Sequence, residues 1–481
     1  MALRLLALLA FWLFAPLLAH ADALPQPVRQ ALQSARIPAS RVAIVVQALD
    51  AANPTLAHQA EQPMNPASVM KLLTTYAALE LLGPAYTWKT TAWSEGATVD
   101  GVLEGNLHLK GSGDPRFAIE HAWSLLRQIR VRGIRRINGD IVLDRSVFSL
   151  PPEEGNPIDD KPMRPYNVGP DGLLLNFRAL RFTLIAEAGQ PRLLQETPSS
   201  GLQLDNQLRS AEGECTGQWK EQIRTRLLAA GAAQRLEFSG TYPMQCGEKA
   251  LNLAPLAAPL QSDGLLRALW NELGGELRGQ VRNGILPAEA RLLATHESAS
   301  LSEAVRDINK FSNNVMARQL FLSLGNDSGP ATAERARQRL QAWLASRNLR
   351  FPELVLDNGS GLSRIERISA GNLNRLLLDA WRRPAMPEFM ASLPIVGLDG
   401  TMKKRLNGAS ASGHAHIKTG TLEGVKTAAG YVLDTRGRRH AVTMLINHPQ
   451  AAAGSAAIDA LIDWVAQGAA NTGQGEKKSH D

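Results

Sequence analysis

The spacing of hydrophobic positions changes along the chain and divides it into parts of different character. A β-branched apolar run over 41–49 predicts a buried strand. Apolar residues at helical spacing over 69–82, followed by Gly83 and Pro84, predict a helix that ends there. Between 90 and 294, short strand-like runs alternate with Gly, Asp and Asn turns, which predicts a region rich in β-structure.

Helical periodicity interrupts this middle region and dominates after it. Within the region, helical stretches are expected over 119–132, 219–230 and 265–273. After it, the period of a helix returns over 302–324 and 331–346. The chain closes with strand-like segments and a last helix over 456–467.

These elements predict a mixed α/β (α+β) fold with one discontinuous domain. Residues 22–91 and 295–468 form it, because the early strand and the terminal helix complete each other. Residues 92–294 are expected to be an insertion of one or two domains. A polar tail over 469–481 is expected to be disordered.

Residues 1–21 have the pattern of a cleaved secretory signal. Arg4 precedes an apolar run over 5–18, and Ala19 and Ala21 give the small-x-small cleavage pattern. An uncleaved membrane anchor is the alternative, but the run is short for a span, which needs about 20 residues. The sequence therefore predicts export to the periplasm.

Composition and charge narrow the class of protein. The 481 residues are 44% hydrophobic and 20% charged, as in ordinary globular proteins, and the formal net charge is +7. A basic exported protein is attracted to anionic wall polymers or membrane surfaces, so peripheral association there is an open expectation. The basic residues are dispersed without a long Lys/Arg run, which argues against nucleic-acid binding.

Cys215 and Cys246 are the only cysteines. In an oxidising compartment, two thiols in one subdomain tend to pair, so we expect a disulfide. Two unpaired buried thiols are the alternative.

The tetrapeptide Ser-Val-Met-Lys at 68–71 places a hydroxyl and an amine one helical turn apart. Ser68 lies at the first turn of the expected helix, and Lys71 follows on the same face within reach of the hydroxyl. A serine with an adjacent base is the arrangement of nucleophilic catalysis. A helix cap with a solvated lysine is the alternative interpretation of this motif alone.

Two later motifs supply further polar groups. Ser312 and Asn314 follow a helix and provide a hydroxyl and an amide, although such residues also cap helices. Lys418, Thr419, Gly420 and Thr421 lie in an expected strand.

A cation flanked by hydroxyls suits a carboxylate, and the glycine at 420 permits close backbone approach. An edge strand with a glycine kink is the alternative. His414 and His416 alternate just before this motif, but no third ligand has suitable spacing, so neither a metal site nor a cofactor is expected.

Taken in order, the three motifs are the signature of penicillin-binding proteins and related β-lactamases. The chain resembles the class C low-molecular-mass penicillin-binding proteins, the D-alanyl-D-alanine carboxypeptidase/endopeptidase family. Further segments similar to that family lie at 111–115, 139–144, 359–364 and 399–401. The long insertion before Ser312 is also typical of this class. One departure is Asn313, where the better-known pattern has Asp.

The resemblance implies a penicillin-binding, β-lactamase-like serine transpeptidase domain and a role for each motif residue. Ser68 would attack the peptide carbonyl, Lys71 would accept its proton, and Ser312, held by Asn314, would pass it to the leaving amine. Lys418 would lower the pKa of Lys71.

The substrates implied are peptidoglycan stem peptides, with β-lactams as covalent inhibitors. Thr419, Gly420 and Thr421 would bind the terminal carboxylate. Asp144 and Arg364 would bind the free amino acid end of diaminopimelate, unless they are ordinary surface charges.

Two other functions share these features. A serine β-lactamase uses the same nucleophile and lysine but turns penicillin over, and the long insertion favours the peptidase. A non-catalytic wall-binding protein on the same fold is the second alternative, and the complete set of reactive side chains argues against it. Carboxypeptidase and endopeptidase activity use the same chemistry, so the sequence does not separate them. Oligomeric state is likewise not readable.

Overall fold

The computed structural model describes residues 24–151, 157–231, 233–327 and 329–471. The expected signal peptide at 1–21 and nearly all of the expected tail at 469–481 lie outside these residues. Within the described part of the chain, no helix has the length and hydrophobicity needed to cross a membrane.

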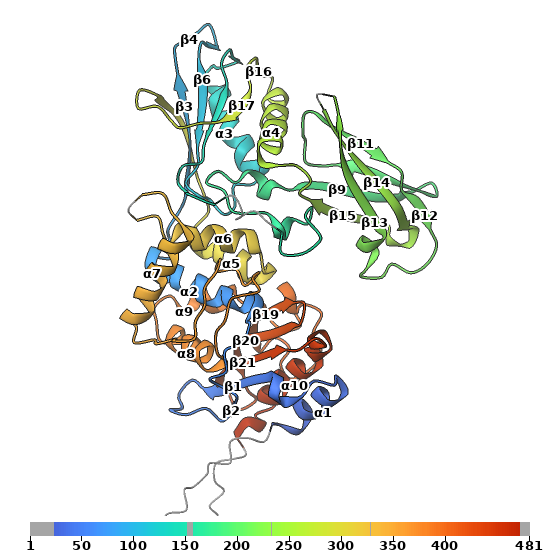
Figure 1. Cartoon of the computed structure of the whole chain (residues 1–481), viewed down its shortest axis with the longest axis vertical. Coiled ribbons are helices and arrows are strands. Elements are labelled where there is room, and N and C mark those ends of the chain that lie inside the picture. Colours follow the sequence, from blue (N-terminus) through green and yellow to red (C-terminus); the bar gives the residue numbers. More distant parts are fainter. Residues whose placement is uncertain (1–23, 152–156, 232, 328, 472–481) are drawn as a thin grey trace, which may run out of the picture.

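A five-stranded antiparallel sheet is built from both ends of the chain (Figure 1). Its strands, in spatial order, are β19 (Ala415–Leu422), β20 (Val425–Leu433), β21 (Arg439–Asn447), β1 (Val42–Ala48) and β2 (Leu56–His58). Strand β1 is the expected early strand. It pairs with β21 along its whole length, from Val42 opposite Ile446 to Ala48 opposite His440. The first and last long strands of the chain are therefore neighbours.

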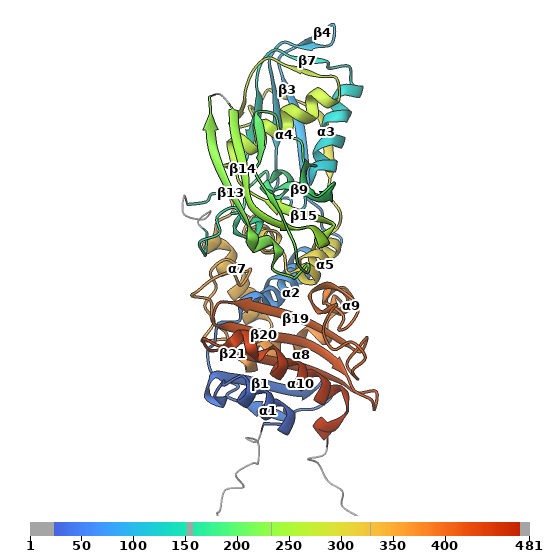
Figure 2. The same ribbon diagram turned by 90° about the vertical axis from the view of Figure 1, so that its right-hand side faces the viewer.

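Helices cover both faces of this sheet (Figure 2). One face packs on α1 (Gln26–Ser34) and α10 (Ser455–Ala466). The other packs on a helical layer formed by α2 (Lys71–Leu82), α5 (Leu301–Phe311), α6 (Asn314–Ser323), α7 (Ala333–Ser346), α8 (Ala370–Trp381) and α9 (Met386–Ser392). Two hydrophobic cores result, one on each side of the sheet.

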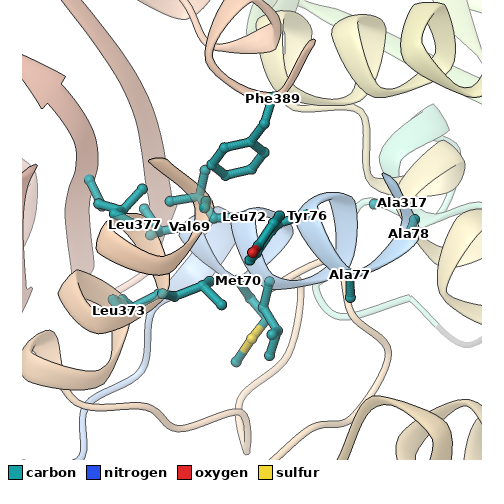
Figure 3. Packing of buried hydrophobic residues seen from close by; sticks show 14 of the residues in the cluster. Val69, Met70, Leu72, Tyr76, Ala77, Ala78, Ala317, Leu373, Leu377 and Phe389 are labelled. Carbon is teal, nitrogen blue, oxygen red and sulfur yellow. The ribbon is translucent and has the colours of Figure 1, made fainter. Parts of the chain in front are cut away.

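Helix α2 is buried on nearly all sides. Its apolar residues are not confined to one stripe, which is the pattern of a helix in the centre of a core. Figure 3 shows Leu72 and Tyr76 of α2 among Leu377 and Phe389 of neighbouring helices. Close packing of this kind holds the start of α2 in one position.

The inserted segment begins with a mixed five-stranded sheet. Its order is β17 (Val281–Asn283), β8 (Ile141–Asp144), β6 (Asn106–Lys110), β3 (Lys89–Glu95) and β18 (Arg291–Glu297). Helices α3 (Ile119–Val131) and α4 (Ala258–Glu272) share its core. Four short strands form a separate sheet that contributes to the same core, in the order β16 (Glu276–Leu277), β7 (Arg136–Ile137), β5 (Val102–Leu103) and β4 (Thr98–Val99). The chain enters through β3 and leaves through its antiparallel partner β18, so the sheet reaches a little beyond the expected limits of 92–294.

A second β-rich unit has its own core. One sheet contains β10 (Gln190–Gln195), β9 (Leu180–Glu187) and β15 (Glu248–Leu253); the other contains β11 (Leu202–Asn206), β12 (Arg209–Ala211), β13 (Ile223–Ala230) and β14 (Ala233–Pro243). Cys215 and Cys246 form the expected disulfide here, with Cα atoms 4.7 Å apart. Closing this loop stabilises the fold by about 3–4 kcal/mol on the chain-entropy model.

The expected helix over 219–230 is wrong. Trp219–Gln222 forms a single 3₁₀ turn, and Ile223–Ala230 is strand β13, which pairs antiparallel with β14. The strand begins with alternating half-buried and exposed residues, Ile223 to Arg226, which is the period of a strand. Pairing with β14 over the whole length of β13 overrides the helical character of the Leu and Ala residues at its end.

Candidate active site

Ser68 lies in a 3₁₀ turn, Ala67–Met70, that runs directly into α2. The turn is held by the residues before it: Asn65 Oδ1 accepts a hydrogen bond from the N–H of Ala67 at 2.9 Å, and Ala67 adopts a left-handed φ of 45°. Asn447 Oδ1 of β21 accepts from the N–H of Asn65 at 2.8 Å. The position of Ser68 is thus tied to the central sheet, and its side chain is half-buried.

Two glycines, Gly420 and Gly361, pack closely against the backbone of Ser68. A Cβ atom on Gly420 of β19 would lie 2.9 Å from the Ser68 nitrogen, and one on Gly361 would lie 2.8 Å from the same atom and within 1.8 Å of the Ala67 oxygen. Only glycine fits at these distances. The strand with Lys418 and the loop over 357–363 therefore both reach the nucleophile.

Lys71 is fully buried and connects three parts of the site. Its Nζ lies 3.0 Å from Ser68 Oγ and donates to Asn314 Oδ1 and to the carbonyl oxygen of Ser360, both at 2.5 Å. Burial, followed by the positive charge of Lys418, holds the pKa of Lys71 well below 10.5. This environment favours the neutral amine, which is the form that accepts a proton.

Ser312 sits at the break between α5 and α6. Its φ of 56° is left-handed, and the helical region expected over 302–324 is divided there into α5 and α6, so Ser312 follows a helix as expected. Asn313 is the N-cap of α6, because its side chain accepts from the N–H of Met316 at 3.1 Å. The amide at 313 thus has a structural role that explains why Asp is not required. Its cap turns Ser312 and Asn314 toward Lys71 and Lys418.

Lys418 joins the second and third motifs. Its fully buried Nζ donates to Ser312 Oγ and to the carbonyl oxygen of Thr419, both at 2.8 Å. Burial lowers the pKa of Lys418 to about 7. The structure therefore brings all five expected catalytic residues into one contiguous group around Ser68.

The expected carboxylate-binding residues lie on β19, the edge strand of the sheet. Thr419 is half-buried and its Oγ1 lies 2.9 Å from Thr401 Oγ1, whereas Thr421 is exposed and accepts from Lys426 Nζ at 3.0 Å. Thr401 was included in a segment of family resemblance, but nothing in its sequence context indicated this contact with Thr419.

Asp144 is not brought into this group. It lies at the end of β8 in the inserted segment with no exposed surface. Its two carboxylate oxygens accept from the N–H groups of Ser146 and Leu286, each at 3.0 Å, and Lys110 Nζ lies 3.5 Å away. In this position the carboxylate holds two loops together and presents no surface to a ligand.

Arg364 is half-exposed and lies beside the turn that joins β19 to β20. Its guanidinium donates to the carbonyl oxygen of Glu423 at 3.2 Å and to the Glu423 carboxylate at 3.0 Å. Glu423 follows β19 in the turn to β20, so Arg364 stands beyond the Thr421 end of the strand. An exposed pair of this kind is weak enough to be displaced by a ligand.

A cavity of about 430 Å³ lies beside Ser312 and Asn314. Aromatic side chains of Tyr166 and Phe177 from the inserted segment and Phe311 from α5 line it. A substrate at Ser312 would therefore contact both parts of the chain. Sequence patterns did not indicate this cavity, because its walls are contributed by separate elements.

No group of three or more His, Cys, Asp or Glu residues in the described ranges is arranged to hold a metal ion.

Comparison with known proteins places this geometry in context. A family model described as D-Ala-D-Ala carboxypeptidase 3 (S13) matches residues 24–468. The D-alanyl-D-alanine carboxypeptidase of Actinomadura sp. (strain R39) is 30% identical over 397 residues, which cover 77% of this chain and 71% of that protein.

Solved structures agree with the sequence matches. The crystal structure of penicillin binding protein 4 from Haemophilus influenzae superposes with a TM-score of 0.73 at 25% identity, covering 88% of this chain and 93% of the other. The same Haemophilus protein in complex with a novel β-lactam matches with a TM-score of 0.69 at 24% identity, covering 87% and 92%. These matches confirm the fold expected from the motifs.

Proposed function

The chain belongs to the D-Ala-D-Ala carboxypeptidase 3 (S13) family, and from this premise we propose that Ser68, Lys71, Ser312, Asn314 and Lys418 carry out its serine peptidase chemistry on peptidoglycan stem peptides. One observation supports the proposal above all: the amine of Lys71 bridges the Ser68 hydroxyl and the Asn314 amide inside a buried, cationic environment.

The first step is acylation. Ser68 Oγ attacks the carbonyl carbon of the penultimate D-alanine while the neutral amine of Lys71 accepts the hydroxyl proton. The N–H groups of Ser68 and Thr421 face the developing oxyanion, and a donor of this kind contributes about 3 kcal/mol to transition-state stabilisation. Burial lowers the pKa of Lys71 and so favours its neutral form, and the geometry places this amine beside the Ser68 hydroxyl.

Release of the terminal D-alanine requires a proton on its nitrogen. Ser312 Oγ delivers it and receives in exchange the proton that Lys71 accepted from Ser68, while Lys418 Nζ, 2.8 Å from the Ser312 hydroxyl, stays protonated. Asn314 keeps the Lys71 amine beside Ser68 during the transfer. The C–N bond breaks, and the acyl group stays on Ser68 until water hydrolyses the ester.

The terminal carboxylate of the substrate binds on β19. Lys418 supplies the positive charge, and the hydroxyls of Thr419 and Thr421 supply donors, with Thr401 orienting the first of them. The peptide backbone lies along the exposed end of this edge strand. A β-lactam carries a carboxylate next to its reactive carbonyl, and it acylates Ser68 in the same position.

Location and domain arrangement complete the proposal. The signal over 1–21 exports the enzyme to the periplasm, where stem peptides occur, and the net charge of +7 favours peripheral contact with anionic wall polymers or membrane surfaces. The discontinuous domain of 22–91 and 295–468 carries the catalytic group. The insertion over 92–294 forms the aromatic wall of the cavity beside Ser312.

Side-chain recognition falls to Arg364 rather than to Asp144. The Arg364 guanidinium is accessible at the rim and can exchange the Glu423 carboxylate for that of a diaminopimelate side chain. Asp144 has both oxygens engaged with backbone groups inside the insertion.

Replacing Asp144 by alanine is expected to destabilise the protein without changing substrate preference. Two N–H groups lose their buried acceptor, at a cost of about 1–3 kcal/mol each. Thermal unfolding and turnover of matched peptides containing diaminopimelate or lysine check this. Asp144→Asn, which retains one acceptor oxygen, serves as the control and is expected to lose less stability. A loss confined to diaminopimelate peptides at unchanged Tm would return Asp144 to substrate binding.

Digestion of purified muropeptides tests the function itself. A pentapeptide monomer is expected to lose its terminal D-alanine, and identification of the products from a cross-linked dimer shows whether the bridge bond is also cut. Rapid turnover of penicillin, with neither wall substrate cleaved, would identify a β-lactamase instead. Absence of product together with absence of penicillin labelling would leave a non-catalytic wall protein.

A further inference from the structure

Glu366 is a fully buried carboxylate that has no part in the mechanism above. It lies behind the loop over 357–361, and its Oε1 accepts from three consecutive N–H groups, those of Asp357, Asn358 and Gly359, at 3.2, 3.1 and 3.0 Å. Its Oε2 is buried and has no hydrogen-bond partner within the described residues. Burial raises the pKa of Glu366 to about 7. Burying a carboxylate oxygen that has no hydrogen-bond partner lowers the stability of the folded protein, so a buried group of this kind is expected to have a role.

The loop that Glu366 holds forms one wall of the catalytic group. The carbonyl oxygen of Ser360, the residue after Gly359 in this loop, accepts a hydrogen bond from Lys71 Nζ at 2.5 Å. Thr74 of α2 donates to the carbonyl oxygen of Gly359 at 2.6 Å. Gly361 packs against the backbone at Ser68. Glu366 is thus connected to the nucleophile and its base through one short, fully ordered loop.

The charges around Lys71 give Glu366 a second connection to the base. Lys418 on β19 and Arg318 on α6 are positive and lower the pKa of Lys71, after burial as the largest cause. Glu366 is the carboxylate that raises it. The carboxylate of Asp357 contributes to the raised pKa of Glu366, after burial as the largest cause. The backbone oxygen of Glu366 accepts from Arg367 Nη1 at 2.7 Å.

We propose that Glu366 is a positioning residue for acylation: it holds the loop over 357–361 so that the Ser360 carbonyl directs the amine of Lys71 toward Ser68, and its buried carboxylate places a negative charge behind that same loop. No bond is made or broken by Glu366. The inference rests on the proposed roles of Ser68 and Lys71. When Glu366 is ionised, it stabilises the ammonium form of Lys71, and acylation then requires a higher pH.

The test separates charge from hydrogen bonding. Glu366→Gln keeps an oxygen acceptor for the three N–H groups and removes a buried charge, so the variant is expected to fold. The rate of acylation by a fluorescent penicillin is measured from acidic to alkaline pH. We expect the midpoint of the rising limb to move to lower pH, and acylation on that limb to be about threefold faster than in the wild type.

Glu353→Gln is the matched control. Its carboxylate also accepts from a backbone N–H, that of Ser369 at 2.9 Å, and from the Asn372 amide, but it is not among the charges that act on Lys71. Its pH profile is expected to coincide with that of the wild type. Glu366→Ala removes the acceptor as well as the charge, and we expect acylation about tenfold slower than in Glu366→Gln at every pH because the loop is released.

The outcomes are distinguishable. A rising limb that coincides in Glu366→Gln and the wild type overturns the charge role, and acylation by Glu366→Ala that matches Glu366→Gln overturns the loop role. If Glu366→Ala fails to fold, the glutamine variant still decides the inference through its pH profile. A wild type that shows no Ser68-dependent labelling overturns the proposed function itself, and with it the role of Glu366.

Discussion

Replacing Ser68 by alanine is expected to abolish covalent labelling by a fluorescent penicillin and to lower D-alanine release by about a million-fold. The hydroxyl of Ser68 lies 3.0 Å from Lys71 Nζ, and no acyl-enzyme forms without it. The residual rate comes from binding and from oxyanion donors that remain. The measurements are gel fluorescence after exposure to penicillin and release of D-alanine from a pentapeptide.

The loss must be chemical rather than structural. The side chain of Ser68 is half-buried, while the backbone around it is held by Asn65, Gly361 and Gly420. Removing one hydroxyl there is expected to change the free energy of unfolding by about 1 kcal/mol at most. Ser346→Ala, at the end of α7, is a matched control that should keep full labelling. Labelling that survives in Ser68→Ala would show that another residue is the nucleophile.

The parts of the fold that the sequence could predict depend on local patterns. The β-branched run over 41–49 is strand β1, and the apolar segment closed by Gly83 is α2. The motif residues Ser68 and Lys71 could be paired because one helical turn separates them. Signals of this kind lie within a few consecutive residues, and in these two segments the tertiary structure agrees with them.

The failures lie where distant segments decide the outcome. Residues 223–230 form a strand because β14 pairs with them. The helix junction at Ser312 was expected, but the contact of its hydroxyl with Lys418 depends on β19, far along the chain. Asp144 has the position in its motif that resemblance assigns to substrate binding, and the motif gave no sign that its carboxylate would accept from the N–H of Leu286, a residue far along the chain.

The same limit applies to the residues that sequence reasoning missed. Thr401, Ser360 and Glu366 act through contacts with Thr419, Lys71 and a loop. None of these contacts has a characteristic spacing in the sequence. Those of Thr401 and Ser360 join separate elements, and that of Glu366 depends on the conformation of the loop over 357–361. Motifs therefore locate the reacting groups, while the structure is needed for the groups that orient them.

Replacing Lys71 by methionine is expected to lower the rate of acylation by about a hundredfold to ten-thousandfold while the protein stays folded. Methionine fills the buried space but accepts no proton, so Ser68 loses its base. Fluorescent-penicillin labelling over time measures the loss, and Lys404→Met, at an exposed position, is the matched control. Acylation at the wild-type rate would remove Lys71 from the role of base.

The difference in the free energy of unfolding between the wild type and Lys71→Met should also depend on pH, because only the wild type has the buried amine. In the folded protein the pKa of Lys71 lies well below its ordinary 10.5, so the unfolded chain binds the extra proton throughout the interval between the two values. Wild-type stability therefore rises with pH across that interval, and the variant lacks this contribution. The variant also leaves Asn314 Oδ1 and the Ser360 carbonyl without a donor, a loss that does not vary with pH. In denaturant unfolding, the free energy of unfolding of the wild type should therefore increase relative to that of the variant as pH rises toward 10.5. A difference that stays constant with pH would mean that Lys71 stays charged in the folded enzyme.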